Sequence, residues 1–302
     1  MPELPEVENL KRGLEKAIVG QKVLRIEVHK PKLVSGKGTI RKADARKTRE
    51  FALGLKGARI TAVERRAKNL IFRLSENKII LTHLKMSGQF AYRPTLSRGT
   101  LDSVIGGHPI ELSEKELPNK HTHIIFELEK GTLYYNDTRM FGYVLYYPTL
   151  AAFEKENHFA LLGLEPFDKK FTAEYLYEAL KNKKGKIKAV LMDQKIVTGL
   201  GNIYADESLF EAGIRPERQT NLISKKEAAI LHTAIIRIMK QAIKVGGSSV
   251  ATYRLLDMSQ GNYAREHKVY GKSGEKCFRC KTPLRKIIIQ SRTTIFCPKC
   301  QH

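Results

Sequence analysis

Four cysteines at the end of the chain constrain its fold more than any other feature of the sequence. They form two Cys-x2-Cys pairs, Cys277 with Cys280 and Cys297 with Cys300, separated by 16 residues. This spacing is typical of zinc ribbons, whereas disulfides are rare in a reducing compartment. Because four protein ligands close the coordination sphere of zinc, the pattern predicts one structural Zn²⁺ and not a catalytic ion.

The charge balance indicates a polyanionic partner. The chain has 54 Lys and Arg against 31 Asp and Glu, a net charge of +23. Such an excess favours nucleic acid, although a merely soluble basic protein is the alternative. A membrane surface also attracts cations, but no apolar run approaches the roughly 18–20 residues of a membrane span. The N-terminus lacks the basic and apolar regions of a signal peptide, so we expect a cytoplasmic protein.

The first 150 residues read as one β-rich domain with a leading helix over residues 5–19. Apolar residues recur at helical spacing in that segment. Seven short runs rich in Ile, Val, Phe and Tyr then predict strands of a sandwich or barrel. The runs are Val23–His29, Ile60–Arg65, Asn69–Leu74, Lys78–Leu84, His123–Leu128, Thr132–Tyr135 and Gly142–Tyr147. Residues 94–120 interrupt them and predict a long surface loop.

The second half changes to helical patterns, with a predicted domain over residues 165–260 and a third over 268–302. Ser224 with Glu227 fits a capping box at one helix start. The predicted helices are Thr172–Asn182, Ile187–Gln194, Tyr204–Ala212 and Ser224–Lys244. In the last domain we expect strands over residues 285–290 and 293–296. Arg292 lies in the predicted turn between them, where a metal-held hairpin would present it to phosphate; a solvated charged turn is the alternative.

The first residues offer amine chemistry. If Met1 is removed, Pro2 presents a secondary amine, and an α-amino group has a pKa of about 7.7–8.0. Enough of it is neutral at cellular pH to attack an aldehyde-level sugar carbon and form an iminium. Glu3 and Glu6 follow, and a carboxylic acid beside the amine could protonate the sugar ring oxygen. The residues alone favour another interpretation, a helix start with acids placed to suit the dipole.

Several motifs occur in order along nearly the whole chain. They are Met1-Pro2-Glu3-Leu4-Pro5-Glu6-Val7-Glu8, Arg65-Arg66-Ala67-Lys68, His83-Leu84-Lys85-Met86-Ser87-Gly88, Asp137-Thr138-Arg139-Met140-Phe141-Gly142 and Gly199-Leu200-Gly201-Asn202-Ile203-Tyr204-Ala205-Asp206-Glu207, followed by the cysteine pairs with Arg292. Together they resemble the formamidopyrimidine-DNA glycosylases, bacterial base-excision repair enzymes of the Fpg/Nei family. The resemblance implies an α+β multidomain fold: an N-terminal β-sandwich, a helix–two-turn–helix domain and a zinc-finger hairpin.

The resemblance also implies a role for each matching residue. Pro2 resembles the nucleophile that forms the Schiff base, Glu3 the acid at the ring oxygen, and Lys68 a lysine near the lesion, with Glu6 in support. Phosphate-gripping roles fall to His83, Asn202 and Arg292, and a DNA-backbone contact to Lys188. Met86, Arg139 and Phe141 resemble the residues that fill the space of the flipped nucleotide and read the orphaned base. These types suit the task, because apolar wedges fill a vacated stack and Arg donates to base edges.

The resemblance predicts a monomeric bacterial glycosylase and abasic-site lyase, associated with the nucleoid, that acts on oxidised purines in double-stranded DNA and cuts by β,δ-elimination. Leu4 favours this over an endonuclease VIII-like preference for oxidised pyrimidines. A non-catalytic DNA- or RNA-binding zinc protein is the alternative from another class. Lys85 and Met140 depart from the family pattern, as does the long insertion over residues 95–117. Residues 248–268 correspond to a lesion-contacting loop.

Overall fold

A computed structural model describes residues 1–38, 40–95, 104–107, 117–248 and 262–302. The chain forms two compact units, one of residues 1–158 with 246–262, the other of residues 159–245 with 263–302. The three predicted segments divide the chain more finely, and their boundaries stay predictions. Most of the predicted lesion-contacting loop, residues 249–261 of 248–268, and most of the predicted insertion lie outside the described residues.

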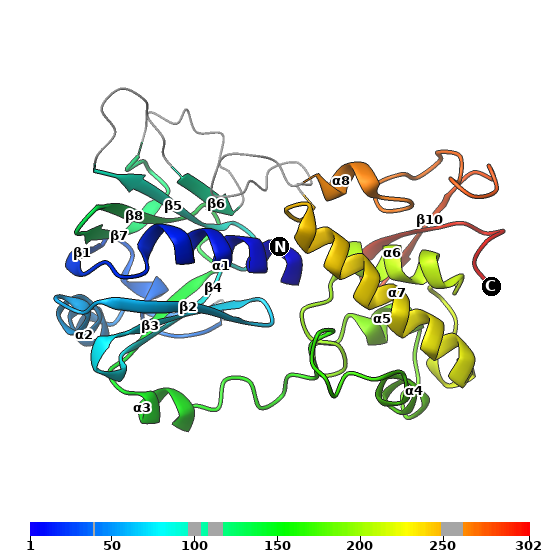
Figure 1. The fold of residues 1–302 in the computed structure, drawn as a ribbon, viewed down its shortest axis with the longest axis horizontal. Helices are drawn as coiled ribbons and strands as arrows, with labels where there is room; N and C mark the ends of the chain where they lie inside the picture. The colour runs from blue at the N-terminus through cyan, green and yellow to red at the C-terminus, as the bar shows by residue number, and fades with distance from the viewer. Residues whose placement is uncertain (39, 96–103, 108–116, 249–261) are drawn as a thin grey trace. The chain divides into compact units, whose positions relative to one another are not determined.

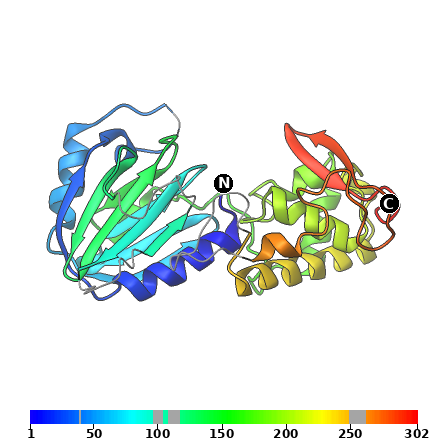
Figure 2. The same cartoon turned by 90° about the horizontal axis from the view of Figure 1, so that it is seen from above.

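The first unit is a β-sandwich of two antiparallel sheets, as the resemblance predicted (Figures 1 and 2). The five-stranded sheet has the order β1-β7-β8-β5-β6 and the four-stranded sheet the order β2-β3-β4-β9. Their bounds are β1 Val23–Val28, β2 Ile60–Arg66, β3 Asn69–Leu74, β4 Ile79–His83, β5 Gly88–Pro94, β6 Val104–Gly107, β7 Thr122–Leu128, β8 Gly131–Asp137 and β9 Tyr143–Tyr147. The seven predicted strands are confirmed, and β5 and β6 are additional.

Apolar side chains from both sheets meet between the layers. Phe72 of one sheet packs edge-on against Phe90 of the other, with ring centroids 5.5 Å apart. The space left between the sheets is about 10 Å³ and is lined only by apolar residues. This filling is what a close-packed protein interior requires, and it gives the strand-end loops a firm base.

Two helices cover the open edges of the sandwich. Helix α1, Leu4–Ile18, packs against the edge strands β2 and β6, and α2, Ala45–Leu55, packs against the edge strands β1 and β9. Uncovered edge strands invite pairing with other chains, so these helices protect the sheets. The short helix α3, Leu150–Lys155, follows β9 and begins at Thr149, whose hydroxyl accepts from Ala152 N.

The second unit is helical with a β-hairpin. Helix α7 packs against both α4 and α6, and α6 in turn packs against β11. The predicted capping box is confirmed, since Glu227 N donates to Ser224 Oγ and Ser224 N donates to Glu227 Oε2. The bounds are α4 Ala173–Lys181, α5 Ile187–Leu191, α6 Asn202–Ala212, α7 Lys225–Lys244, α8 Tyr263–Glu266, β10 Arg285–Ile289 and β11 Arg292–Phe296.

The hairpin turn is tighter than the sequence indicated. Ile289 pairs with Arg292, so only Gln290 and Ser291 form the loop, and both have positive φ (46° and 57°). Two-residue loops of this kind match the twist of the flanking strands. Arg292 is therefore the first residue of β11 and not a turn residue, and its direction is set by the strand pairing.

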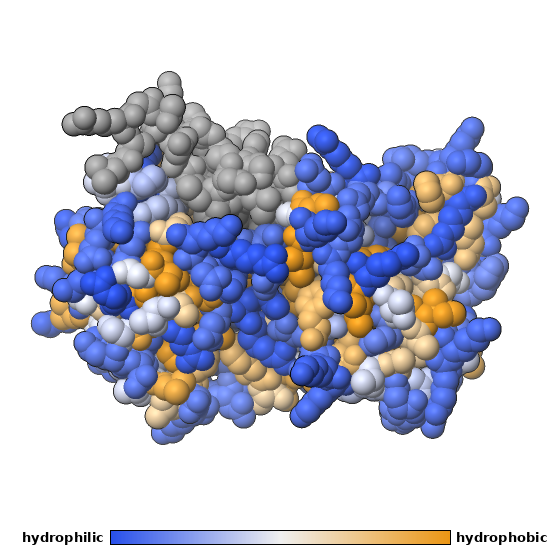
Figure 3. All heavy atoms as spheres, viewed as in Figure 1, coloured by the Kyte–Doolittle hydropathy of each residue, from blue (hydrophilic) through white to orange (hydrophobic). Residues whose placement is uncertain are grey.

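The surface agrees with the composition. On the face drawn in Figure 3, hydrophilic residues prevail and hydrophobic residues form small separate patches. Among the described helices, none combines the length and apolar character needed to cross a membrane.

Candidate functional site

The predicted catalytic residues gather at the start of α1. Pro2, Glu3 and Glu6 are all buried, and Glu3 N donates to Glu6 Oε2 at 2.9 Å. Glu6 Oε1 also accepts from Ser248 N at 2.7 Å. Hydrogen bonds from backbone amides to a carboxylate are strong and directional, so Glu6 is fixed in place. Glu6 therefore supports the turn that carries Pro2 and Glu3.

An ion pair ties this helix to the turn that carries Lys68. Arg65 Nε lies 2.8 Å from Glu8 Oε2, and Arg65 Nη1 donates to Ala67 O at 2.9 Å. Burial raises the pKa of Glu8, but the hydrogen bonds and charges of Arg65 and Arg12 outweigh that effect and lower it. Ala67 has φ of 54°, and Lys68 after it is buried, only 5% exposed. The tight turn between β2 and β3 thus places this amine inside the protein.

His83, at the end of β4, is held in one neutral form. Its Nδ1 accepts from Lys85 N at 3.0 Å, which leaves the proton on Nε2. Burial, with the charges of Lys85 and Lys68, lowers the pKa of His83 from 6.5 to about 3. The imidazole is therefore uncharged at neutral pH and can donate one hydrogen bond through Nε2.

Asp137 joins the two loops that carry Met86, Arg139 and Phe141. Ser87 Oγ donates to Asp137 Oδ1, and Gly142 N donates to Asp137 Oδ2 at 2.8 Å. Ser87 Oγ also accepts from Arg139 N at 3.0 Å. Position 142 requires glycine, because a Cβ there would overlap the Tyr135 hydroxyl. One carboxylate thus sets the spacing of both loops.

The side chains on these loops remain available to a partner. Met86 is 37% exposed, and the Arg139 guanidinium lies 4.6 Å from the centre of the Phe141 ring. Lys85 and Met140, two departures from the family pattern, both have φ of 53°. Such a conformation costs a non-glycine residue free energy. Arg41 donates to Met140 O at 3.0 Å and so holds that strained position.

In the second unit, Asn202 and Arg292 lie at the same end of the hairpin. Asn202 Nδ2 donates to Thr293 O at 3.2 Å, and Thr293 follows Arg292 in the chain. Arg292 is exposed and lines a groove of about 680 Å³. Lys184 and Lys186 line the same groove, which makes it basic.

Lys188 does not lie where the sequence led us to expect. Its side chain is fully buried, and Nζ lies 2.7 Å from Asp206 Oδ1. An ammonium enclosed by protein cannot reach a DNA phosphate directly, so the predicted backbone contact does not fit this geometry. The contact was predicted from the resemblance alone, and the sequence did not reveal that an acidic partner lies on α6.

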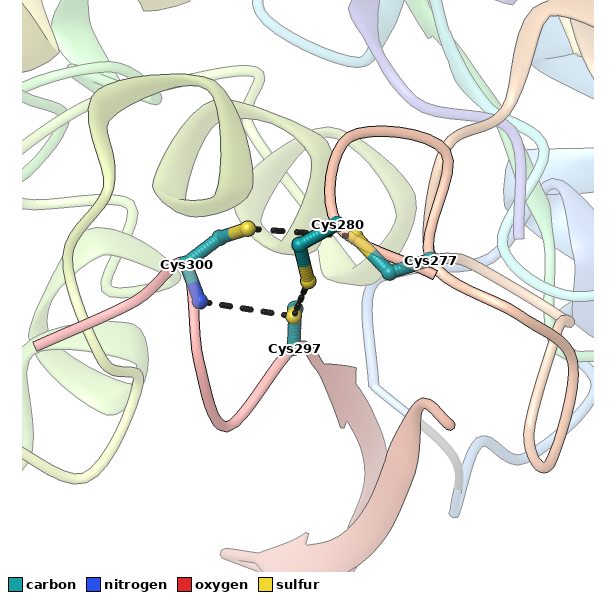
Figure 4. Close-up of side chains that lie close together, drawn as sticks. All are labelled: Cys277, Cys280, Cys297 and Cys300. Atoms are coloured by element: carbon teal, nitrogen blue, oxygen red, sulfur yellow. Dashed lines mark hydrogen bonds between the residues drawn. The ribbon is translucent and has the colours of Figure 1, made fainter. Parts of the chain in front are cut away.

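The four cysteines cluster as the spacing predicted (Figure 4). Their sulfur atoms all lie within 4.8 Å of one another, and Cys280 Sγ is 3.4 Å from Cys297 Sγ. Tetrahedral ligands at a Zn–S distance of about 2.3 Å would be roughly 3.8 Å apart, so the cluster could hold one metal ion. Phe210 of α6 joins Cys277 and Cys297 in a small apolar cluster, which attaches this module to the helix.

Some contributing residues were absent from the predictions. Arg65 and Glu8 lie inside recognised motifs, but nothing in the sequence shows that they pair. Arg41, Lys184 and Asp206 were not singled out. For Lys184 a signal existed in the basic run over residues 183–186.

Family models match most of the sequence. The model for the formamidopyrimidine-DNA glycosylase N-terminal domain matches residues 1–144, and that for the glycosylase H2TH domain matches residues 162–254. Curated proteins called formamidopyrimidine-DNA glycosylase are similar over 100% of both chains. Examples come from Desulfitobacterium hafniense, 35% identical over 301 residues, and Lactococcus lactis subsp. cremoris, 39% identical over 307 residues.

Solved structures agree with these matches. The Lactococcus lactis Fpg in complex with DNA containing an abasic site has a TM-score of 0.84 at 35% identity, and the match covers 99% of each chain. The wild-type enzyme with DNA containing N7-benzyl-Fapy-dG has a TM-score of 0.84 at 35% identity. A MutM complex with DNA containing carbocyclic 8-oxo-G has a TM-score of 0.82 at 34% identity. The latter two matches cover 100% of each chain.

Proposed function

The chain belongs to the formamidopyrimidine-DNA glycosylase family, and we propose on that basis that it excises oxidised purines from double-stranded DNA and then cleaves the strand. The observation that carries this proposal is the start of α1, where Pro2 precedes the buried carboxylates of Glu3 and Glu6. The solved relatives in complex with abasic-site, Fapy-dG or 8-oxo-G DNA support the substrate class.

The glycosylase step uses the amine of Pro2 after Met1 is removed. Its lone pair attacks C1′ of the damaged nucleotide, the bond from C1′ to the base breaks, and the base leaves with a proton. Glu3 protonates the ring oxygen, the bond between C1′ and that oxygen opens, and an iminium forms between Pro2 and C1′. Burial excludes water, which otherwise competes for these groups.

The lyase steps follow because the iminium is an electron sink. Loss of a proton from C2′ releases the 3′ phosphate by β-elimination, and a second elimination releases the 5′ phosphate. Lys68, buried near the start of β3, is proposed to act close to the lesion. Hydrolysis of the remaining iminium returns Pro2 as the free amine.

The other residues bind and shape the DNA. His83, as a neutral donor, Asn202 and Arg292 are proposed to contact phosphates. Met86 and Phe141 are proposed to fill the space that the flipped nucleotide leaves, and Arg139 to read the base opposite the lesion. The four cysteines are proposed to bind Zn²⁺, since thiolate sets of this spacing suit that ion.

Borohydride trapping on a duplex with one abasic site tests the proposal. Borohydride reduces the iminium, so the wild-type protein should become covalently attached to DNA, and peptide mass spectrometry should place the adduct on residue 2. Pro2→Gly, or a protein that retains Met1, should lose trapping and lyase activity while still binding DNA. Pro5→Ala changes the same residue type three positions later, in the first turn of α1, and should trap normally.

The outcomes separate the competing functions. A protein that binds the duplex without any adduct would be the non-catalytic binding module. Normal trapping by a protein that keeps Met1 would exclude the amine mechanism. Release of thymine glycol at a higher rate than 8-oxoguanine would reassign the protein to the preference for oxidised pyrimidines.

A further inference from the structure

A buried ion pair in the second unit connects α5, α6 and β11. The side chains of Lys188 and Asp206 are 0% and 1% exposed, and their charged atoms are 2.7 Å apart. Lys188 Nζ also donates to Thr293 O at 3.0 Å and to Thr294 Oγ1 at 2.8 Å. Asp206 Oδ2 accepts from Ile295 N at 3.3 Å. Both charges therefore converge on three successive residues of one strand.

The pair is a costly way to hold a strand. Removing two charges from water costs several kcal/mol per ion, and buried pairs often stabilise a fold less than apolar residues of the same volume. Burial raises the pKa of Asp206 to about 7 even though Lys188 opposes the shift. A gain in overall stability is thus a weak explanation for the pair, whereas a directional constraint on β11 fits its geometry.

The two ends of β11 are held differently. Cys297 follows its last residue and belongs to the four-cysteine cluster. At the other end, the carbonyl of Thr293 accepts from Lys188 and from Asn202 Nδ2 at 3.2 Å. Arg292 precedes that carbonyl directly. Two proposed phosphate contacts, Asn202 and Arg292, are therefore tied to a single backbone group that Lys188 holds.

We propose that Lys188 and Asp206 are positioning residues that fix the Arg292 end of the hairpin against α6, so that Arg292 and Asn202 meet DNA phosphates at a set spacing. The inference rests on the proposed DNA-binding function. In this account Lys188 acts only through Arg292 and Asn202 and never contacts DNA.

A double variant tests the idea without leaving an unpaired charge. Lys188→Met with Asp206→Leu removes both charges and keeps the side chains long and apolar, so folding is best preserved. Thr294→Val is a milder second variant, because it removes the hydroxyl that accepts from Lys188 Nζ at 2.8 Å and donates to Arg292 O at 3.3 Å, and leaves both charges in place. The double variant leaves the net charge unchanged, and Lys181→Met, which removes one exposed positive charge from α4, shows whether the loss of a lysine alone changes the slope. Circular dichroism and metal analysis confirm that each variant is folded and loaded.

The measurement is the salt dependence of binding to a duplex that carries a tetrahydrofuran abasic-site analogue. Each phosphate contact contributes about 0.9 to the log–log slope. The double variant should lower the slope by about that amount. Thr294→Val should also lower the slope, by a smaller amount, and Lys181→Met should leave the slope unchanged. The dissociation constant should change more than the trapping rate at saturating DNA.

Combination with Arg292→Ala and Asn202→Ala together separates positioning from contact. If Lys188 acts through Arg292 and Asn202, the double variant should add no further change in slope to that combination. A further drop of about 0.9 would show a direct contact by Lys188, and a folded double variant with wild-type slope would show a purely structural pair; either result overturns the inference. Failure of the proposed function looks different, since the wild-type protein would then neither bind selectively nor trap.

Discussion

The two loops that carry Met86, Arg139 and Phe141 in the first unit and the β10–β11 hairpin of the second unit are held in place by different kinds of contact. The loops that carry Met86 and Arg139 extend from strands of a large sandwich, and Asp137 joins them through neutral hydroxyl and amide donors. The hairpin has only a small apolar cluster among the described residues, and it is held by the four-cysteine cluster and by the buried pair of Lys188 and Asp206. The loops on the packed sandwich are joined by the hydrogen bonds of one carboxylate, Asp137. The hairpin of the smaller module is held at both ends of β11, by the cysteines at one end and by Lys188 and Asp206 at the other.

The variant with the largest expected effect on this contrast is Cys297→Ser. Zinc binding to such modules contributes on the order of 10 kcal/mol to their folding, so the variant should lose its metal and much of its DNA affinity. The sandwich should stay folded, because its core shares no residue with the module. Metal analysis and limited proteolysis measure the two effects, with the exposed Ser273→Ala as control. A wild-type protein without zinc would refute the metal assignment.

Arg139→Ala tests the role of the loop that carries Arg139 and Phe141, without changing the hairpin. Loss of a good base contact should flatten discrimination between cytosine and adenine opposite the lesion by about 1–3 kcal/mol. The ratio of kcat/KM on the two duplexes reports this change. Arg46→Ala, at an exposed position of α2, is the matched control. An unchanged ratio would remove Arg139 from the role of reading the opposite base.

Arg292→Ala examines the hairpin alone. It should lower the log–log salt slope of binding by about 0.9, equally for either opposite base. Arg285→Ala, at the other end of the same hairpin, controls for the lost charge. If Arg292→Ala instead changed the opposite-base preference and left the slope intact, the two roles would be reversed: base recognition would belong to the second unit and phosphate contact to the first.

The remaining prediction concerns the pH dependence of stability and does not involve DNA binding. The pKa of His83 is about 3 in the folded protein, below its ordinary value of 6.5, so the unfolded chain takes up this proton first. The contribution of His83 to stability is therefore present above about pH 6.5 and declines as the pH falls towards 3. Denaturant unfolding between pH 4.5 and 7 should show a shallower pH dependence for His83→Gln, by up to about 1.4 kcal/mol per pH unit. Parallel curves would mean that His83 is not buried in its neutral form.

Local patterns were enough to predict most elements and the cysteine cluster. Capping at Ser224 depends on two residues three positions apart. Each predicted strand is a short run rich in Ile, Val, Phe and Tyr, so its own residues were enough to indicate it. Helix α2, Ala45–Leu55, was missed because only Phe51 and Leu55 of its residues are buried. Strand β5, Gly88–Pro94, was missed because it begins with glycine and ends with proline, which usually mark turns.

The site could be predicted wherever its residues are neighbours in sequence. Pro2, Glu3 and Glu6 belong to one helix start, so a short motif was enough to place these three residues together. The partners of Lys188 are Asp206, 18 positions later, and Thr293, 105 positions later. Burial of its charge depends on how three elements pack, and no local pattern carries that information.

The hydrogen bond from Ser248 to Glu6 has a consequence for synthesis. The two residues are 242 positions apart, yet both belong to the first unit, whose main part ends at His158. Since chains emerge from the ribosome N-terminus first and domains fold as units, the sandwich can form long before Ser248 is translated. A nascent chain therefore carries the proline and its carboxylates in an incomplete setting, and the contact with Glu6 closes only near the end of translation.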